Sequence, residues 1–163
     1  MISDKMQKAL NEQINAELFS SYLYLSMSVY FESENWLGFS KWMQVQSQEE
    51  YSHAMKFIKY LNDVDGRVLL DGIEKPKSKW KSPLEVFEES QKHELYITER
   101  INSLAGLAVQ EKDYSTSLFL NYFITEQVEE VSTAAQIVHK FKLLNDNKTS
   151  LFLLDRELGM RVK

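Results

Sequence analysis

The chain has 163 residues, of which 44% are hydrophobic, with 5 glycines, 2 prolines and no cysteine. This composition favours one helical domain, argues against an all-β protein rich in tight turns, and excludes disulfides, thiolate metal sites and iron–sulfur clusters. The net charge of −5, without a basic cluster, argues against nucleic-acid binding. Because no apolar run reaches the ~20 residues that cross a bilayer and the start lacks a secretory signal, we expect a cytoplasmic protein without a membrane partner.

The first half of the chain predicts two long helices. One runs from about Ser3, a candidate N-cap, to about Ser33, and after a short break the other runs from about Trp36 to Asp63. Residues 66–82 show no helical periodicity and contain glycine, proline and several lysines, which indicates a long crossover. The apolar face of the first helix is expected to follow Leu10, Ile14, Leu18, Ser21, Leu25 and Val29.

The second half predicts two more long helices. Ser82-Pro83 has the pattern of an N-cap followed by a proline at the first helical position, and the helix that begins there should end near Glu111. Asp113 is the candidate cap of a fourth helix that reaches about Leu144. The four helices are of similar length, so their midpoints share one level in an antiparallel bundle.

A short fifth helix is expected over residues 151–158, opened by Thr149 and ended by Gly159. Two tight connections and one long link imply two antiparallel hairpins joined across a bundle. The sequence therefore predicts an all-α fold, with residues 1–163 forming a single ferritin-like four-helix bundle that has one long crossover and a short C-terminal helix.

Six residues with metal-binding side chains lie on the apolar stripes near the helix midpoints. Burying one ionised carboxylate without compensation costs several kcal/mol, so four helices that each turn one or more polar groups inward need a shared cation. A metal pair supplies that charge. The six residues are Glu17, Glu50, His53, Glu94, Gln127 and Glu130.

The spacing of these residues assigns them to two inequivalent metals. Glu50 and His53 are three residues apart and share a helix face, so the carboxylate can bridge both metals while the imidazole binds one. Glu17 completes the first set, and Glu94 and Glu130 join Glu50 in the second. Oxygen-dominated ligation suits iron, with manganese or zinc able to intrude, and open positions would let dioxygen bridge the pair. Gln127 is a weak ligand or a hydrogen-bond partner.

Tyr24 and two histidines lie near this constellation. Tyr24, two turns from Glu17, either donates a hydrogen bond or an electron to the site or is a core tyrosine whose hydroxyl is satisfied. His93 and His139 are expected at the surface or hydrogen-bonded to a neighbour, outside the site.

Three more carboxylates, Glu49, Glu126 and Glu129, adjoin the candidate ligands in sequence. They either belong to a solvated charged face, as most helical glutamates do, or form a third iron position that shares Glu130. The sequence spacing alone is compatible with both alternatives.

These motifs resemble a known family. The chain is similar to the non-haem bacterial ferritins in Glu17, Tyr24, residues 50–53 (Glu-Tyr-Ser-His), Glu94, residues 127–130 (Gln-Val-Glu-Glu) and the terminal residues 151–158. The resemblance covers essentially the whole chain. It implies iron storage in a closed shell of 24 subunits, with a ferroxidase centre in each bundle that oxidises iron(II) with dioxygen or hydrogen peroxide. It also implies a third iron site, built by Glu49, Glu126, Glu129 and Glu130.

The chain departs from two related families at positions that matter for their function. Bacterioferritins carry a haem-ligating methionine directly after the bridging glutamate and repeat Glu-x-x-His on the fourth helix. Here the methionine position is Tyr51, and the fourth helix carries Gln127-x-x-Glu130, so no haem is expected. In animal ferritins acidic residues line a three-fold channel where this chain has Ser117 and Leu120, so the resemblance does not give the path by which iron enters.

Four alternatives to an iron-storage ferroxidase remain. A DNA-protecting miniferritin would build its site between subunits, often carries a basic tail and usually lacks a fifth helix at this end. A di-iron oxygenase needs a substrate channel for which the chain leaves little room, and a rubrerythrin-type peroxidase needs cysteines. A helical bundle that only binds partners would have to satisfy five or six inward acids without metal.

Overall fold

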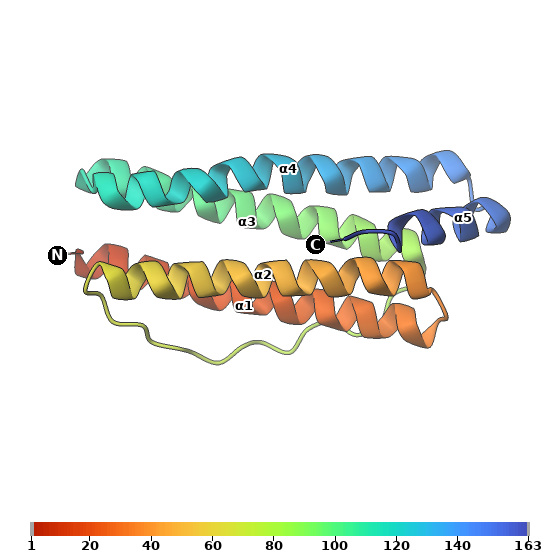
Figure 1. The fold of residues 1–163 in the computed structure, drawn as a ribbon, viewed down its shortest axis with the longest axis horizontal. Coiled ribbons are helices and arrows are strands. Elements are labelled where there is room, and N and C mark those ends of the chain that lie inside the picture. Colours follow the sequence, from red (N-terminus) through yellow and green to blue (C-terminus); the bar gives the residue numbers. More distant parts are fainter. Residues whose placement is uncertain (1, 163) are drawn as a thin grey trace.

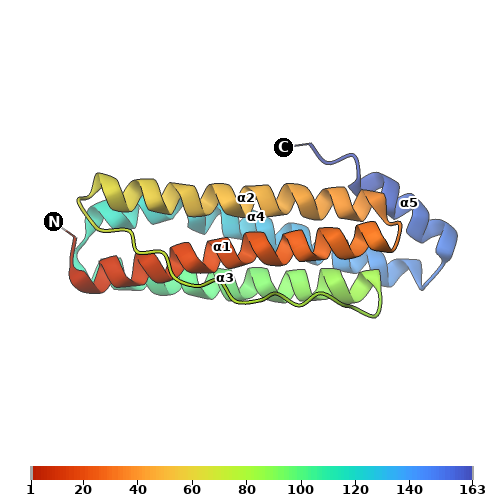
Figure 2. The same ribbon diagram turned by 90° about the horizontal axis from the view of Figure 1, so that it is seen from below.

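The computed structural model describes residues 2–162, which form helices joined by loops (Figure 1). α1 forms an antiparallel hairpin with α2, α3 forms another with α4, and α1 packs against α3. The segment between α2 and α3 runs along the length of the bundle from one end to the other (Figures 1 and 2). The all-α four-helix bundle with one long crossover and a short fifth helix is therefore confirmed. The helices are α1 Asp4–Ser33, α2 Leu37–Asp63, α3 Pro83–Glu111, α4 Tyr114–Leu144 and α5 Lys148–Leu158.

Three of the expected helix caps are present. The side chains of Ser3, Ser82 and Asp113 each accept a hydrogen bond from a backbone N–H three residues on, at the starts of α1, α3 and α4. The start of the fifth helix was predicted wrongly. Asn147, not Thr149, caps α5, because its Oδ1 accepts from the Ser150 N–H at 3.0 Å, and the helix begins at Lys148.

The buried face of α1 differs from the expected one beyond its middle. Leu25 and Val29 are 42% and 62% exposed, whereas Tyr24, Met27 and Phe31 are fully buried. The expected face advanced by about 3.8 residues per turn, which drifts around a helix of 3.6 residues per turn and leaves the core. The prediction for Leu25 and Val29 was wrong for that reason.

Two apolar clusters fill the bundle, one on each side of its middle. One contains aromatic side chains such as Phe39 and Phe87 together with residues of α5. The other contains Phe57 and Phe123 with aliphatic residues from the far halves of the helices. The polar residues considered below lie along the helices between these two clusters. The apolar ends therefore fix the four helices around a polar middle layer.

Contacts between α2 and α5 fix the C-terminal part of the chain. The start of α2 has no cap from Trp36, and instead Asp155 of α5 accepts from the Phe39 N–H at 2.8 Å. A Cβ atom on Gly38 would lie 1.8 Å from the carbonyl oxygen of Asp155, and one on Gly159 would lie 2.8 Å from the Cα of Gly38. The two backbones can approach this closely only because both positions are glycine. Among the described residues, no helix is long and apolar enough to span a membrane.

Candidate metal centre

The α1–α2 side of the polar layer brings three candidate ligands together. Glu17, Glu50 and His53 are 1%, 2% and 4% exposed, and one ligand atom from each lies within 4.8 Å of the others. His53 Nδ1 is 3.3 Å from a carboxylate oxygen of Glu50. Two carboxylates and an imidazole at this separation match the oxygen and nitrogen donors of a non-haem iron site.

Glu17 has one oxygen bonded and one oxygen free. Gln13 donates its amide N–H to Oε1 of Glu17 at 2.7 Å, while Oε2 is buried without a hydrogen-bond partner among the described residues. Because buried carboxylate oxygens are normally paired, the free oxygen is where a cation fits. This orphaned atom is the sharpest sign of a metal in the layer.

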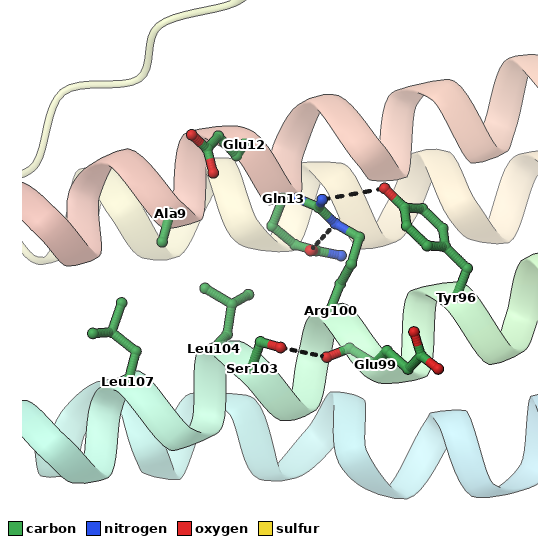
Figure 3. A pocket seen from close by; sticks show the side chains of 9 residues that line it. All are labelled: Ala9, Glu12, Gln13, Tyr96, Glu99, Arg100, Ser103, Leu104 and Leu107. Carbon is green, nitrogen blue, oxygen red and sulfur yellow. Dashed lines mark hydrogen bonds between the residues drawn. The ribbon is translucent and has the colours of Figure 1, made fainter.

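Arg100 reaches this layer indirectly. It donates to Gln13 Oε1 at 3.0 Å and to the Tyr96 hydroxyl at 3.2 Å, beside a surface pocket of about 350 Å³ between α1 and α3 (Figure 3). Gln13 in turn donates a hydrogen bond to Glu17. The guanidinium thus orients the first carboxylate without neutralising it.

The α3–α4 side is organised around Glu94, which is 2% exposed. Its carboxylate accepts the hydroxyl of Tyr24 and the amide of Gln127 at 3.2 Å, and Ser90 donates to the Tyr24 oxygen at 3.2 Å. Tyr24 is therefore both a core tyrosine with a satisfied hydroxyl and a hydrogen-bond donor to a candidate ligand. Gln127 also donates to the Glu94 backbone carbonyl at 3.2 Å, so its amide nitrogen faces Glu94.

Glu130 joins the two sides through a residue that sequence reasoning missed. The amide nitrogen of Gln46 donates to Glu50 Oε1 and to Glu130 Oε2, both at 3.0 Å. Gln46 is 1% exposed and lies one helical turn before Glu50 on the same stripe. This spacing from Glu50 could have indicated an inward position. Burying a neutral amide costs less than burying an ionised acid, however, so Gln46 did not stand out as a residue that requires a cation.

The three candidates for a third site are less enclosed. Glu49 and Glu126 are half-buried and Glu129 is exposed. Glu126 lies 3.8 Å from His53 Nε2, and Glu49 is paired with Arg161 of the C-terminal tail. Both alternatives, a solvated charged face and a third iron site, are compatible with these positions.

The two remaining histidines lie outside the cluster, as expected. His93 is 9% exposed and its Nε2 shares a hydrogen bond with Ser20 at 2.7 Å, while His139 is exposed. Burial lowers the pKa of His93 to about 4, so it is neutral at physiological pH.

Burial makes the carboxyl groups of the layer weak acids. It raises the pKa of Glu17 to about 8, aided by the charge of Glu50. Burial, with Glu94 and Glu130 adding like charge, holds the pKa of Glu50 well above its usual range. Burial also raises the pKa of Glu94 and takes that of Glu130 to about 7, with Glu94 as the next cause. In the metal-free chain these groups hold protons, which a bound cation would displace.

Comparison with known proteins identifies the family. The model of the ferritin-like domain matches residues 7–144. A bacterial non-heme ferritin of Bacteroides fragilis is 46% identical over 99% of this chain and 100% of its own length. One of Campylobacter jejuni is 40% identical over 96% of this chain and 93% of its own.

Solved structures agree with the sequence relatives. A structure described as a novel open pore ferritin from the hyperthermophilic archaeon Archaeoglobus fulgidus matches with a TM-score of 0.98 and 49% identity, covering 99% of this chain and 100% of the other. A humanized archaeal ferritin matches with the same TM-score and identity, over 99% of this chain and 98% of its own. The resemblance to bacterial non-haem ferritins is confirmed, and the chain belongs to the ferritin family.

Proposed function

We propose that this protein stores iron and oxidises it at a dinuclear ferroxidase centre inside its own helical bundle. Membership of the ferritin family supports iron storage. The observation that carries the ferroxidase is the buried set of Glu17, Glu50 and His53, whose ligand atoms lie close together, with one oxygen of Glu17 left unpaired. These buried carboxyl groups hold protons in the metal-free chain, and a cation is what allows them to ionise inside the bundle.

Two iron(II) ions are the substrate. Glu17, Glu50 and His53 bind one of them, and Glu50, Glu94 and Glu130 bind the other, with Glu50 as the bridge. Each iron gives up one electron, and dioxygen takes both electrons with two protons and leaves as hydrogen peroxide, which can itself serve as an oxidant. The carboxyl groups release protons when iron binds, and their burial keeps water from competing for the open positions.

Two neighbours position the second iron's ligands. Tyr24 and Gln127 donate hydrogen bonds to Oε1 and Oε2 of Glu94, respectively, which fixes the orientation of its carboxylate. Because a donor to the charged form favours ionisation, both residues also help Glu94 to accept a cation. When only one electron is available from the irons, Tyr24 would give up one electron and pass its hydroxyl proton toward Glu94, to which it is hydrogen-bonded, leaving a tyrosyl radical.

The proposal extends to a third iron and to the assembly. Glu49, Glu126, Glu129 and Glu130 would hold a third iron on its way between the centre and a ferric mineral. The protein would work in the cytoplasm as one ferritin-like domain per chain, in a 24-subunit shell and without haem. A site enclosed within one bundle favours this reading over a miniferritin, whose site lies between subunits.

Stopped-flow absorbance tests the ferroxidase. Metal-free protein is mixed with two equivalents of iron(II) per chain in aerated buffer, beside a Glu50→Ala, His53→Ala double variant. Glu12→Ala, an exposed change on α1, is the matched control. The proposal expects fast oxidation in the parent and the control, and oxidation at the buffer rate in the double variant. Buffer-rate oxidation in all three proteins would show that the inward carboxylates are structural.

A further inference from the structure

The C-terminal tail returns from α5 to the middle of α2. After Leu158 the chain turns back beside α2 (Figures 1 and 2), and its turn is closed by hydrogen bonds from the backbone N–H groups of Met160 and Arg161 to α5. Asp155 and the close approach of Gly38 and Gly159 fix where this turn begins. The tail's position is thus set by the docking of α5.

Arg161 makes contacts with three residues on one face of α2. Its guanidinium lies 4.4 Å from the ring centroid of Trp42, donates to Gln46 Oε1 at 2.8 Å and pairs with Glu49 Oε2 at 2.5 Å. These residues are four and three positions apart, the spacing of one helix face. The Arg161 side chain is only 20% exposed, so the tail holds a largely desolvated cation at this place.

The guanidinium lies at the edge of the carboxylate layer. Gln46, whose oxygen it binds, turns its amide nitrogen inward to Glu50 and Glu130. Glu49, whose carboxylate it binds, is a member of the proposed third iron site. The Arg161 guanidinium and a metal ion from solution would therefore compete for the carboxylate of Glu49.

We propose that Arg161 is a built-in competitor of the third metal ion. It neutralises Glu49 in the metal-free protein, and a metal that takes Glu49 as a ligand must displace the guanidinium and with it the tail from Trp42. This inference rests on the third site of the proposed function. It goes beyond that site by making the last residues of the chain control its affinity.

Zinc titration tests the competition without redox chemistry. Calorimetry on the assembled metal-free protein gives the affinity and number of zinc ions bound per chain for the parent, Arg161→Ala, Glu49→Gln and the double variant. Because Arg161→Ala removes a partly buried charge-assisted pair, it should increase the affinity for the third zinc ion about tenfold. Glu49→Gln should weaken the third zinc, and in that background the arginine change should have no further effect. Arg156→Ala, an exposed change on α5, is the matched control and should leave the titration unchanged.

Tryptophan emission gives a second, structural readout. In the parent, the third zinc should change the emission of Trp42 as the guanidinium leaves its ring, and this change should be absent in Arg161→Ala. An Arg161→Ala protein that binds no third zinc, or binds it no more tightly than the parent, overturns the proposal. The first two zinc ions in the same titration report separately on the dinuclear centre, so a failure of the ferroxidase site is distinguishable from a failure of the competition.

Discussion

Replacing Glu17 by glutamine should stabilise the metal-free protein at alkaline pH. Glu17 is 1% exposed, and its Oε2 has no partner among the described residues. Glutamine has nearly the same shape and carries no charge, and its amide nitrogen could donate to the neighbouring carboxylate of Glu50. At alkaline pH, where Glu17 has lost its proton, the variant therefore removes a cost that in the parent only a bound cation removes.

The pH dependence follows from the raised pKa of Glu17. Between its usual value of 4.5 and about 8, the folded chain holds a proton that the unfolded chain has released. The stability of the parent therefore falls as the pH rises through this window and levels off above about 8. The difference in proton affinity corresponds to about 5 kcal/mol, at about 1.4 kcal/mol for each tenfold change. Relaxation of the site reduces this figure, so we expect the Glu17→Gln protein to gain about 2 to 5 kcal/mol at about pH 9 and little at about pH 5.

Guanidinium chloride unfolding of metal-free protein, followed by circular dichroism at several pH values, measures this gain. All proteins are compared at one concentration, because assembly makes apparent stability depend on concentration. Glu12→Gln, an exposed change on the same helix, should shift stability by no more than about 0.5 kcal/mol at any pH. If the difference between Glu17→Gln and the parent does not grow as the pH rises, Glu17 is not a buried acid that awaits a cation.

Three further changes test other contacts. Gly38→Ala places a Cβ against the backbone of Asp155 and should cost about 1 to 3 kcal/mol by shifting α5; an unchanged denaturation midpoint would show that the close approach is not required. Tyr24→Phe removes a donor to Glu94 and should slow iron oxidation about tenfold; an unaltered stopped-flow rate would leave Tyr24 a packing residue. Gln46→Leu removes the donor shared by two carboxylates and should weaken binding of the first two zinc ions about tenfold; parent-like affinities in calorimetry would contradict its positioning role.

Local signals in the sequence predicted most of the fold. Ser3, Ser82 and Asp113 cap their helices because a short polar side chain and the first helical turn are sufficient for a cap. Asn147 and Thr149 both satisfy that rule, so the local signal could not choose between them. For Leu25 and Val29 the error was one of phase, because a few tenths of a residue per turn accumulate along a helix of 30 residues.

The candidate site was predictable where burial is costly, and not where contacts are long-range. The four glutamates among the candidates could be chosen because inward acids at the helix midpoints conflict with an apolar core. His53 and Gln127 were added because each lies three residues from one of these glutamates. Asp155 capping α2 and Arg161 pairing with Glu49 join residues more than a hundred positions apart. Neither contact leaves a periodic signal, since each depends on how α5 docks. Gln46 was missed because a neutral amide on an apolar stripe carries no comparable demand for charge.

Anomalous diffraction at the iron edge, from crystals soaked anaerobically with iron(II), tests the central claim most directly. The account predicts two iron positions inside each bundle. One would be coordinated by Glu17, Glu50 and His53, and the other by Glu50, Glu94 and Glu130. Iron that binds only on the outer surface, with no anomalous peak within the bundle, would contradict the dinuclear centre.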